Sequence, residues 1–201
     1  MTGWFIAVEG TDGSGKSTQA RLLAQRLGAV YTREPGGTPL GERLRDMVLN
    51  PVDDHPVDRT EALMIAAARA QHVAEVVRPA LAKGRHVVTD RFLESSIAYQ
   101  GYGRRLGPDE VAAVSAFATE GLMADLVVFI DVDGPVAANR RGGHLDRIEA
   151  AGEEFHARVV AAYRAMAVAE ADRWIVIDGT GTVEEVAERV AAGVVKRFGS
   201  V

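Results

Sequence analysis

The 201-residue sequence contains no cysteine. Disulfides, thiolate metal sites and a cysteine nucleophile are therefore excluded. No apolar stretch approaches the roughly 20 residues that a membrane-spanning helix needs, so we expect no contact with a membrane. The apolar run near the N-terminus stops at Glu9, and no basic segment precedes it, so we expect no signal peptide. A cytoplasmic location is the default expectation.

Positive charge and asparagine are also scarce. There are 28 acidic and 23 basic residues, which gives a net charge of −5. A nucleic-acid partner held by bulk electrostatics is therefore not expected. The two asparagines, Asn50 and Asn139, precede Pro and Arg, so the N-K-x-D motif of guanine-specific switch proteins is absent. The five histidines show no metal-ligand spacing.

The composition is otherwise that of an ordinary globular protein. Hydrophobic residues make up 47% of the chain and charged residues 25%, which is typical of globular proteins. The length suits one domain. No repeat, low-complexity tract or linker divides the chain. We therefore expect a single domain over residues 1–201.

The stretch GTDGSGKS, which starts at Gly10, fits the phosphate-binding pattern G-x-x-x-x-G-K-[ST]. Glycines let backbone N–H groups form a cradle for phosphates at the start of the following helix. Lys16 would reach the β- and γ-phosphates of a nucleotide, and the Ser17 hydroxyl would bind Mg²⁺. An apolar run precedes this loop and a helical pattern follows it, as the motif requires. The residues expected at the triphosphate are Gly10, Thr11, Asp12, Gly13, Ser14, Gly15, Lys16, Ser17 and Thr18.

Short apolar runs alternate with helical patterns along the chain, without a hairpin signal. This order predicts an α/β fold with a five-stranded parallel sheet and helices on both faces. Ligands of such sheets bind at the carboxyl ends of the strands. Residues 91–105 are predicted to be rich in loops, with one short helical piece. The predicted strands are residues 4–8, 30–32, 86–90, 126–131 and 174–177.

Charged residues lie at the carboxyl ends of three predicted strands, namely Arg33-Glu34, Asp90-Arg91 and Asp131. Asp90 ends a buried strand, where a carboxylate would bind Mg²⁺ directly or through water, although capping of the next turn is the alternative. Arg91 could bridge donor and acceptor phosphates. Asp131 ends another strand, and catalysis and turn capping are comparable readings for it. Arg69 closes an apolar helical run and needs a buried partner or a ligand.

Arginines surround the paired glycines at 142–143. A mobile segment of this kind, about residues 136–152, could close over the transferring phosphoryl group and neutralise its charge. A solvated charged loop is the alternative reading. The candidate lid arginines are Arg140, Arg141 and Arg147.

The motifs GTDGSGKSTQ, TREPGGTPLGERLRD, TEALMIAAARAQH, TDRFLESSIAYQGYGR and LDRIE occur in this order. Together they resemble the thymidylate kinase family over nearly the whole chain. The TREPGG and AYQGYGR stretches are more specific than the phosphate loop, which many families share. The resemblance implies a P-loop kinase fold with a small lid, and transfer of the γ-phosphoryl of ATP to dTMP with Mg²⁺. It also implies a homodimer.

The same resemblance implies roles for residues of an acceptor site. Asp12 would lie near the sugar and phosphate of dTMP, Arg45 would clamp its phosphate, and Arg69 would donate to a carbonyl of the base. Arg91 would contact the acceptor phosphate and the reacting phosphoryl group. Tyr99 would exclude a ribose 2′-hydroxyl. The implied dTMP site comprises Asp12, Glu34, Arg45, Ile65, Arg69, Arg91, Ser96, Tyr99 and Gln100.

Two positions depart from common family patterns. Ile65 stands where a phenylalanine commonly stacks on thymine, and base–aromatic stacking contributes about 1–3 kcal/mol. Gly13 stands where one variant of the family carries an arginine in the phosphate loop. The other variant has its catalytic arginine in the lid, and this chain matches it. The expected catalytic residues are Asp12, Lys16, Arg91 and Arg147.

Two other functions stay open from the sequence alone. Another P-loop kinase of nucleosides or nucleoside monophosphates would share the loop and lid but not the base pocket. A regulatory P-loop NTPase would turn over ATP without a monophosphate acceptor, but TREPGG and AYQGYGR would then have no evident role.

Overall fold

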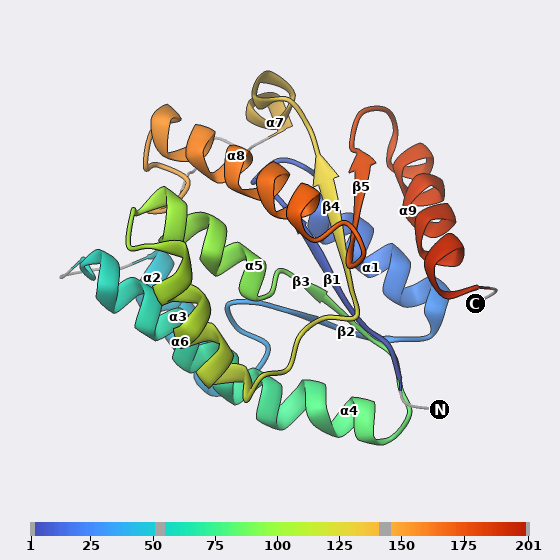
Figure 1. The fold of residues 1–201 in the computed structure, drawn as a ribbon, viewed down its shortest axis with the longest axis horizontal. Coiled ribbons are helices and arrows are strands. Elements are labelled where there is room, and N and C mark those ends of the chain that lie inside the picture. The colour runs from blue at the N-terminus through green and yellow to red at the C-terminus, as the bar shows by residue number, and fades with distance from the viewer. Residues whose placement is uncertain (1–2, 51–54, 141–145, 200–201) are drawn as a thin grey trace.

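The computed structural model describes residues 3–50, 55–140 and 146–199. Five parallel strands form one sheet in the order β2-β3-β1-β4-β5, with helices on both sides (Figure 1). The expected α/β fold with a five-stranded parallel sheet is therefore confirmed. The strands are β1 (Phe5–Gly10), β2 (Val30–Arg33), β3 (Val87–Asp90), β4 (Leu126–Asp131) and β5 (Trp174–Asp178).

Helices and two π-helical segments, η1 and η2, connect the strands. Gly28 ends α1 in a left-handed conformation (φ 59°), which a residue without Cβ adopts easily. Thr182 caps α9 through a reciprocal hydrogen-bond pair with Glu185. The helical elements are α1 (Lys16–Leu27), α2 (Pro39–Leu49), α3 (Asp58–His72), η1 (Val73–Val77), α4 (Arg78–Ala82), α5 (Leu93–Ser96), η2 (Ile97–Gly103), α6 (Pro108–Thr119), α7 (Gly134–Arg140), α8 (Glu153–Ala169) and α9 (Val183–Phe198).

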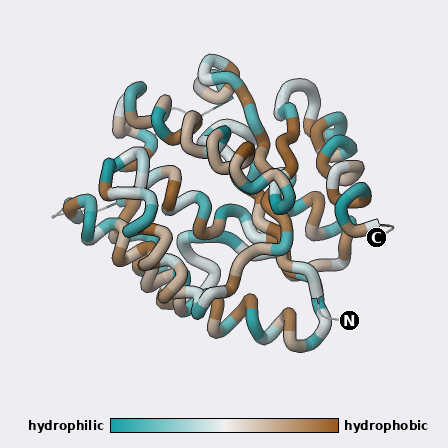
Figure 2. Tube along the Cα trace, in the orientation of Figure 1, coloured by the Kyte–Doolittle hydropathy of each residue, from teal (hydrophilic) through white to brown (hydrophobic). Residues whose placement is uncertain are grey.

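Alternate residues of the central strands face two separate cores. Phe5 and Ala7 of β1 belong to the core under α3, η2 and α8, whereas Ile6 and Val8 belong to the core under α1 and α9. Figure 2 shows hydrophobic residues concentrated along the central strands, with hydrophilic residues interleaved on outer helices such as α9. Burial on both faces explains why these strands read as continuous apolar runs.

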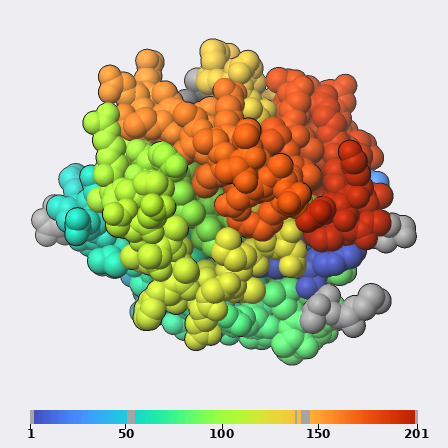
Figure 3. All heavy atoms as spheres, viewed as in Figure 1, coloured from blue at the N-terminus to red at the C-terminus, as the bar shows by residue number. Residues whose placement is uncertain are grey.

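The outer surface is made by the helices. In the space-filling view, α6, α8 and α9 form most of the face turned to the viewer (Figure 3). No helix in the described residues is long and apolar enough to cross a membrane.

The prediction for residues 91–105 was wrong in its main feature. Residues 93–103 are helical, as α5 followed by η2. This segment packs against α3, α6 and α8, and Ala98, Tyr99 and Gln100 are buried. Tertiary packing therefore overrides the low helix propensity of Gly101 and Gly103.

Candidate active site

The phosphate loop connects β1 to α1 at the centre of the sheet. Gly15 precedes the first residue of α1 with a φ of 88°, a conformation that glycine adopts without strain. Lys16 is 7% exposed, and its ammonium group donates to Asp12 at 3.1 Å and to the Thr11 carbonyl at 3.5 Å. The loop thus has the geometry of a helix N-terminus with one buried cation, which favours a bound anion.

Gly13 lies directly against α7. Its φ is 86°, and a Cβ atom added there would lie 2.1 Å from the carbonyl oxygen of Ala137. No side chain fits at this position while α7 stays in place. The loop therefore cannot supply a catalytic arginine of its own in this conformation.

Asp12 joins the phosphate loop to the residue that follows β3. Its carboxylate accepts hydrogen bonds from Arg91 at 2.5 Å, from Lys16 at 3.1 Å and from the Tyr99 hydroxyl at 3.0 Å. Burial alone would raise the pKa of Asp12, but Arg91 and Lys16 hold this pKa well below its ordinary value. Asp12 is thus ionised and holds both cations in place.

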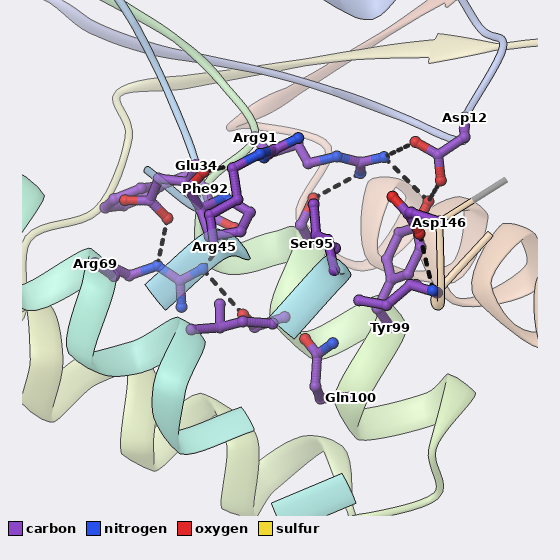
Figure 4. Close-up of a pocket in the computed structure, with 15 residues that line it drawn as sticks. Asp12, Glu34, Arg45, Arg69, Arg91, Phe92, Ser95, Tyr99, Gln100 and Asp146 are labelled. Atoms are coloured by element: carbon purple, nitrogen blue, oxygen red, sulfur yellow. Dashed lines mark hydrogen bonds and ion pairs between the residues drawn. The ribbon is translucent and has the colours of Figure 1, made fainter. Parts of the chain in front are cut away.

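Arg91 has an unusual backbone conformation, with a φ of 72°. A non-glycine residue in the left-handed region costs of order 1 kcal/mol or more and persists only where neighbours enforce it. The Arg91 N–H donates to the Val8 carbonyl at 3.0 Å, and the Thr89 hydroxyl donates to the Arg91 carbonyl at 2.9 Å. The sheet edge therefore aims this side chain across the cavity toward Asp12 (Figure 4).

A buried carboxylate, Glu9, organises the groups behind Arg91. It accepts hydrogen bonds from the Ser95 hydroxyl at 2.6 Å and the Tyr163 hydroxyl at 2.8 Å. These two hydroxyls in turn accept from Arg91 Nη1 at 3.0 and 3.3 Å. Burial and the nearby Glu94 raise the pKa of Glu9 to about 7.

All nine residues predicted for the acceptor site line one cavity beside the phosphate loop. They come from the phosphate loop, the residues that follow β2 and β3, α2, α3 and the α5–η2 segment, which are far apart in the sequence. Figure 4 shows several of them turned toward the same space. Six further residues line the cavity: Pro35, Leu49, Phe92, Ser95, Asp146 and Ile148. For Phe92 the sequence leaves core packing and a base platform open, and it assigns the other five no place in the acceptor site.

Arg69 lies at one end of this cavity and is only 1% exposed. It donates to Glu34 at 2.7 Å and to the Ser96 hydroxyl at 2.9 Å. His72 contacts the other Glu34 oxygen at 2.8 Å. Burial would raise the pKa of Glu34, but the Arg69 charge and the His72 contact hold it below the ordinary value. The predicted need of Arg69 for a buried partner is thus met by Glu34.

Arg45 lies at the cavity wall with a carbonyl partner, the Pro35 oxygen at 3.0 Å. Burial and the charge of Arg33 lower its pKa. An anion in the cavity would stabilise the charged form of this guanidinium group. Arg45 and Arg91 therefore give the cavity an electropositive region suited to a phosphate.

The predicted lid arginines fall in different places. Arg140 ends α7 and donates to the carbonyls of Gly179 and Gly181 at 3.0 and 3.5 Å. Arg141 lies outside the described residues, as do 142–145 of the predicted lid. Arg147 donates to Glu61 at 2.5 Å and to the Val48 carbonyl at 2.9 Å. It therefore sits on the acceptor side, next to the lining residues Asp146 and Ile148.

The two predicted metal residues differ in their surroundings. Asp90 is 7% exposed, and its Oδ1 has no hydrogen-bond partner among the described residues. An orphaned buried carboxylate oxygen fits a cation ligand. Ser17 is the second residue of α1. No cluster of three or more metal-binding side chains occurs in the described part of the chain, so phosphate oxygens would have to complete a Mg²⁺ site here.

Asp131, for which two readings were open, forms an ion pair. Both its oxygens accept from Arg164 at 3.0 Å. This pair lies at the surface, with Arg164 half exposed, and neither residue lines the acceptor cavity.

Sequence and structure comparisons agree on one family. A sequence model of the family "Thymidylate kinase" matches residues 8–190. The thymidylate kinase of Leifsonia xyli subsp. xyli is 50% identical over 94% of this chain and 92% of its own length. That of Bifidobacterium longum subsp. infantis is 45% identical over 96% of this chain and 87% of its own. The chain belongs to the thymidylate kinase family.

A solved structure of the family has the same fold. The thymidylate kinase from Ehrlichia chaffeensis superposes with a TM-score of 0.81 at 30% identity, over 96% of this chain and 99% of the other. The resemblance drawn from the sequence motifs is thus confirmed at the level of the family.

Sequence reasoning missed Glu9, Tyr163 and Ser95, which support Arg91. The sequence held one indication of a buried role for Glu9, because this charged residue lies at the end of an apolar strand. Its partners are separated from it by 86 and 154 positions. Such pairings become visible only in the folded chain of this thymidylate kinase.

Proposed function

We propose that the cavity beside the phosphate loop is where this thymidylate kinase binds dTMP. The chain phosphorylates dTMP to dTDP, and ATP is the phosphoryl donor that the family implies. The convergence of all nine predicted acceptor residues on one cavity carries the assignment. Asp12 and Arg91 mark the boundary between the donor loop and this cavity.

We assign the dTMP phosphate to the region of Arg45 and Arg91, and the base to the end lined by Arg69, Ile65 and Gln100. Tyr99, which is buried and bonded to Asp12, would pack against the sugar and select deoxyribose. Arg69 would donate to a carbonyl of thymine. The spread of donors along the cavity supports this orientation, because phosphate and pyrimidine carbonyls both accept hydrogen bonds.

The reaction we propose is a direct in-line transfer without a covalent enzyme intermediate. Lys16 and Arg91 would neutralise charge on the transferring phosphoryl group, while the cavity holds the acceptor in line. The acceptor is already an anion, so no strong general base is required. The ion pairs of both cations with Asp12 support a preorganised arrangement.

Ser17 and Asp90 are the residues that would hold Mg²⁺. Bound there, the ion would neutralise negative charge on the donor phosphates. The unpartnered Oδ1 of Asp90 supports this assignment, and β3 carries it next to the phosphate loop through its pairing with β1.

We further propose that the catalytic arginine comes from a lid over about residues 136–152 within a single domain spanning residues 1–201. The contact of Gly13 with the Ala137 carbonyl supports this, because it leaves no room for an arginine in the loop. Arg147 is the favoured lid residue, ahead of Arg140 and Arg141. Its present partner, Glu61, would have to release it for contact with the phosphoryl group.

The enzyme would work as a homodimer in the cytoplasm. Phe117 of α6 is 88% exposed and Leu63 of α3 is 58% exposed, and these two helices pack side by side. Large apolar side chains exposed on two neighbouring helices are candidates for a subunit interface if they form one patch. Sedimentation of the wild type and of Phe117→Glu tests the surface, since a dimer formed through α6 should dissociate in the variant.

A panel of acceptors tests the proposed site. Turnover with MgATP is measured with dTMP, dUMP, dCMP, dGMP, UMP and AMP. The highest kcat/KM is expected for dTMP, and UMP should be a poor substrate because of its 2′-hydroxyl. A preference for any other acceptor would contradict the assignment of the cavity.

The lid proposal has its own test. Turnover of Arg147→Ala should fall further than turnover of Arg141→Ala or Arg140→Ala. If the three variants lose equal activity, or if Arg147→Ala loses least, Arg147 is not the catalytic lid residue.

A further inference from the structure

Glu61 is a fully buried carboxylate beside the acceptor cavity, and the proposed mechanism uses it only as the present partner of Arg147. Its side chain is 0% exposed. Its Oε1 accepts from the amide nitrogen of Gln100 at 2.8 Å. Its Oε2 accepts from Arg104 at 3.1 Å and from Arg147 at 2.5 Å. Three side chains from two other segments thus meet on one carboxylate of α3.

This arrangement dictates which way the Gln100 amide points. A carboxylate paired with guanidinium groups has no proton to give, so it only accepts hydrogen bonds. Gln100 must therefore turn its NH₂ group to Glu61, and its carbonyl oxygen faces away. Among the described residues, the hydrogen bond that the Gln100 side chain makes is the one its amide nitrogen donates to Glu61. Gln100 itself lines the cavity.

Helix geometry places this amide opposite Arg69. Glu61, Ile65 and Arg69 are four residues apart, so they share one face of α3. Ser96 and Gln100 have the same spacing on α5–η2. Arg69 binds Ser96 and Glu61 binds Gln100. The cavity lining therefore includes a donor, Arg69, and an acceptor, the Gln100 oxygen, and Ile65 lines the same cavity. Figure 4 shows Arg69 and Gln100 at the cavity.

A donor and an acceptor that line the same base site can discriminate between pyrimidines. Thymine offers the O4 acceptor and an N3–H donor, whereas cytosine offers an amino donor and an unprotonated N3. The Gln100 oxygen can accept from the N3–H of thymine. Against cytosine, two acceptors would face each other, and such unpaired polar contacts in a closed site are costly.

We propose that Glu61 is a positioning residue for base selection. It fixes the Gln100 amide with its oxygen toward the base, so that the site favours thymine over cytosine. Arg104 directly follows η2 and lies outside the proposed lid. Its contact with Glu61 therefore does not depend on the position of the lid, and Glu61 remains a hydrogen-bond acceptor only. The proposal rests on the cavity being the dTMP site.

The test measures kcat/KM for dTMP and dCMP with MgATP in the wild type, Glu61→Gln, Gln100→Met and the double variant. A glutamine at position 61 can donate to Gln100, so the amide is free to turn over. The preference for dTMP, which is kcat/KM for dTMP divided by kcat/KM for dCMP, should fall about tenfold in each single variant. This is the effect of roughly one net hydrogen bond. In the double variant this ratio should fall no further than in Gln100→Met alone, because Glu61 acts through Gln100.

Two further variants separate positioning from general damage. Glu61→Asp keeps a carboxylate that only accepts hydrogen bonds, so its preference for dTMP over dCMP should stay close to that of the wild type. Glu94→Gln removes a comparably buried carboxylate, paired with Arg173 at 2.8 Å and absent from the cavity wall, and should leave the ratio unchanged. Thermal melting of every variant verifies folding.

Several outcomes would overturn the proposal. It fails if Glu61→Gln folds and keeps the wild-type ratio of kcat/KM for dTMP and dCMP. It also fails if Glu61→Gln lowers this ratio equally in the wild type and in the Gln100→Met background. If Glu61→Gln does not fold, an unchanged ratio in Gln100→Met still refutes it. A wild type that does not prefer dTMP to dCMP would contradict the cavity assignment itself, before any variant is considered.

Discussion

The phosphate loop and the acceptor cavity are arranged to bind charged ligands in different ways. The loop relies on backbone geometry at the start of α1, with Lys16 as its buried cation. The cavity relies on charged side chains that already bind one another, as in Arg69–Glu34 and Arg91–Asp12. A backbone cradle recognises phosphate in any nucleotide. A network of fixed side chains can also recognise the shape and polarity of a base.

The difference predicts how each region responds to mutation. Removing the Lys16 side chain from the loop should remove catalysis and leave the fold intact, because its buried partner Asp12 keeps its ion pair with Arg91. Removing one from the cavity network should lower stability as well, because a buried charge loses its partner. The predictions below test this contrast, from the largest effect to the smallest.

Lys16→Ala should lower kcat by about a thousandfold or more, equivalent to roughly 4 kcal/mol of transition-state stabilisation. The melting temperature should stay close to that of the wild type. Steady-state turnover with MgATP and dTMP, together with thermal melting, measures both quantities. Lys83→Ala is the control, because Lys83 is exposed at the end of α4. Near-normal turnover in Lys16→Ala would contradict the proposed mechanism.

Arg69→Ala should lower the free energy of unfolding by about 3–5 kcal/mol, because it leaves Glu34 buried without its guanidinium partner. The KM for dTMP should rise in the same variant. Urea denaturation and steady-state kinetics are the measurements. Arg26→Ala breaks an exposed arginine–glutamate pair with Glu188 and should cost less than about 1 kcal/mol. Equal losses in the two variants would remove the contrast between buried and exposed pairs.

Glu9 should make stability depend on pH. Burial and Glu94 raise its pKa to about 7 in the folded chain, from an ordinary 4.5. The folded state therefore binds the proton more tightly, so the stability that Glu9 contributes is complete below about pH 4.5 and is lost as pH rises through 7. The difference in unfolding free energy between wild type and Glu9→Gln should fall on the order of 2 kcal/mol over that interval. A pH-independent difference in urea denaturation would show that Glu9 titrates normally.

The sequence predicts the strands well, for physical reasons, and the nine residues proposed for the acceptor site line one cavity. Buried parallel strands give continuous apolar runs, and the kinase motifs have fixed spacing. It does not predict that residues 93–103 are helical, because packing against α3 and α8 decides this. Nor does it predict the partners of a charge: nothing local connects Glu9 with Tyr163, or Glu61 with Arg104 and Arg147. Those pairings depend on how distant segments meet in the fold.

Ile65→Phe tests whether the cavity holds the base by stacking or by polar contacts alone. Ile65 lies between Glu61 and Arg69 along α3. An aromatic ring there could stack on the base, which contributes about 1–3 kcal/mol, while the larger side chain costs some packing energy. We expect the KM for dTMP to fall about fivefold, with kcat nearly unchanged. Val195→Phe, at an exposed position of α9 away from the cavity, should leave KM unaltered. If Ile65→Phe instead raises KM without loss of stability, the base does not lie over Ile65, and polar contacts alone hold it.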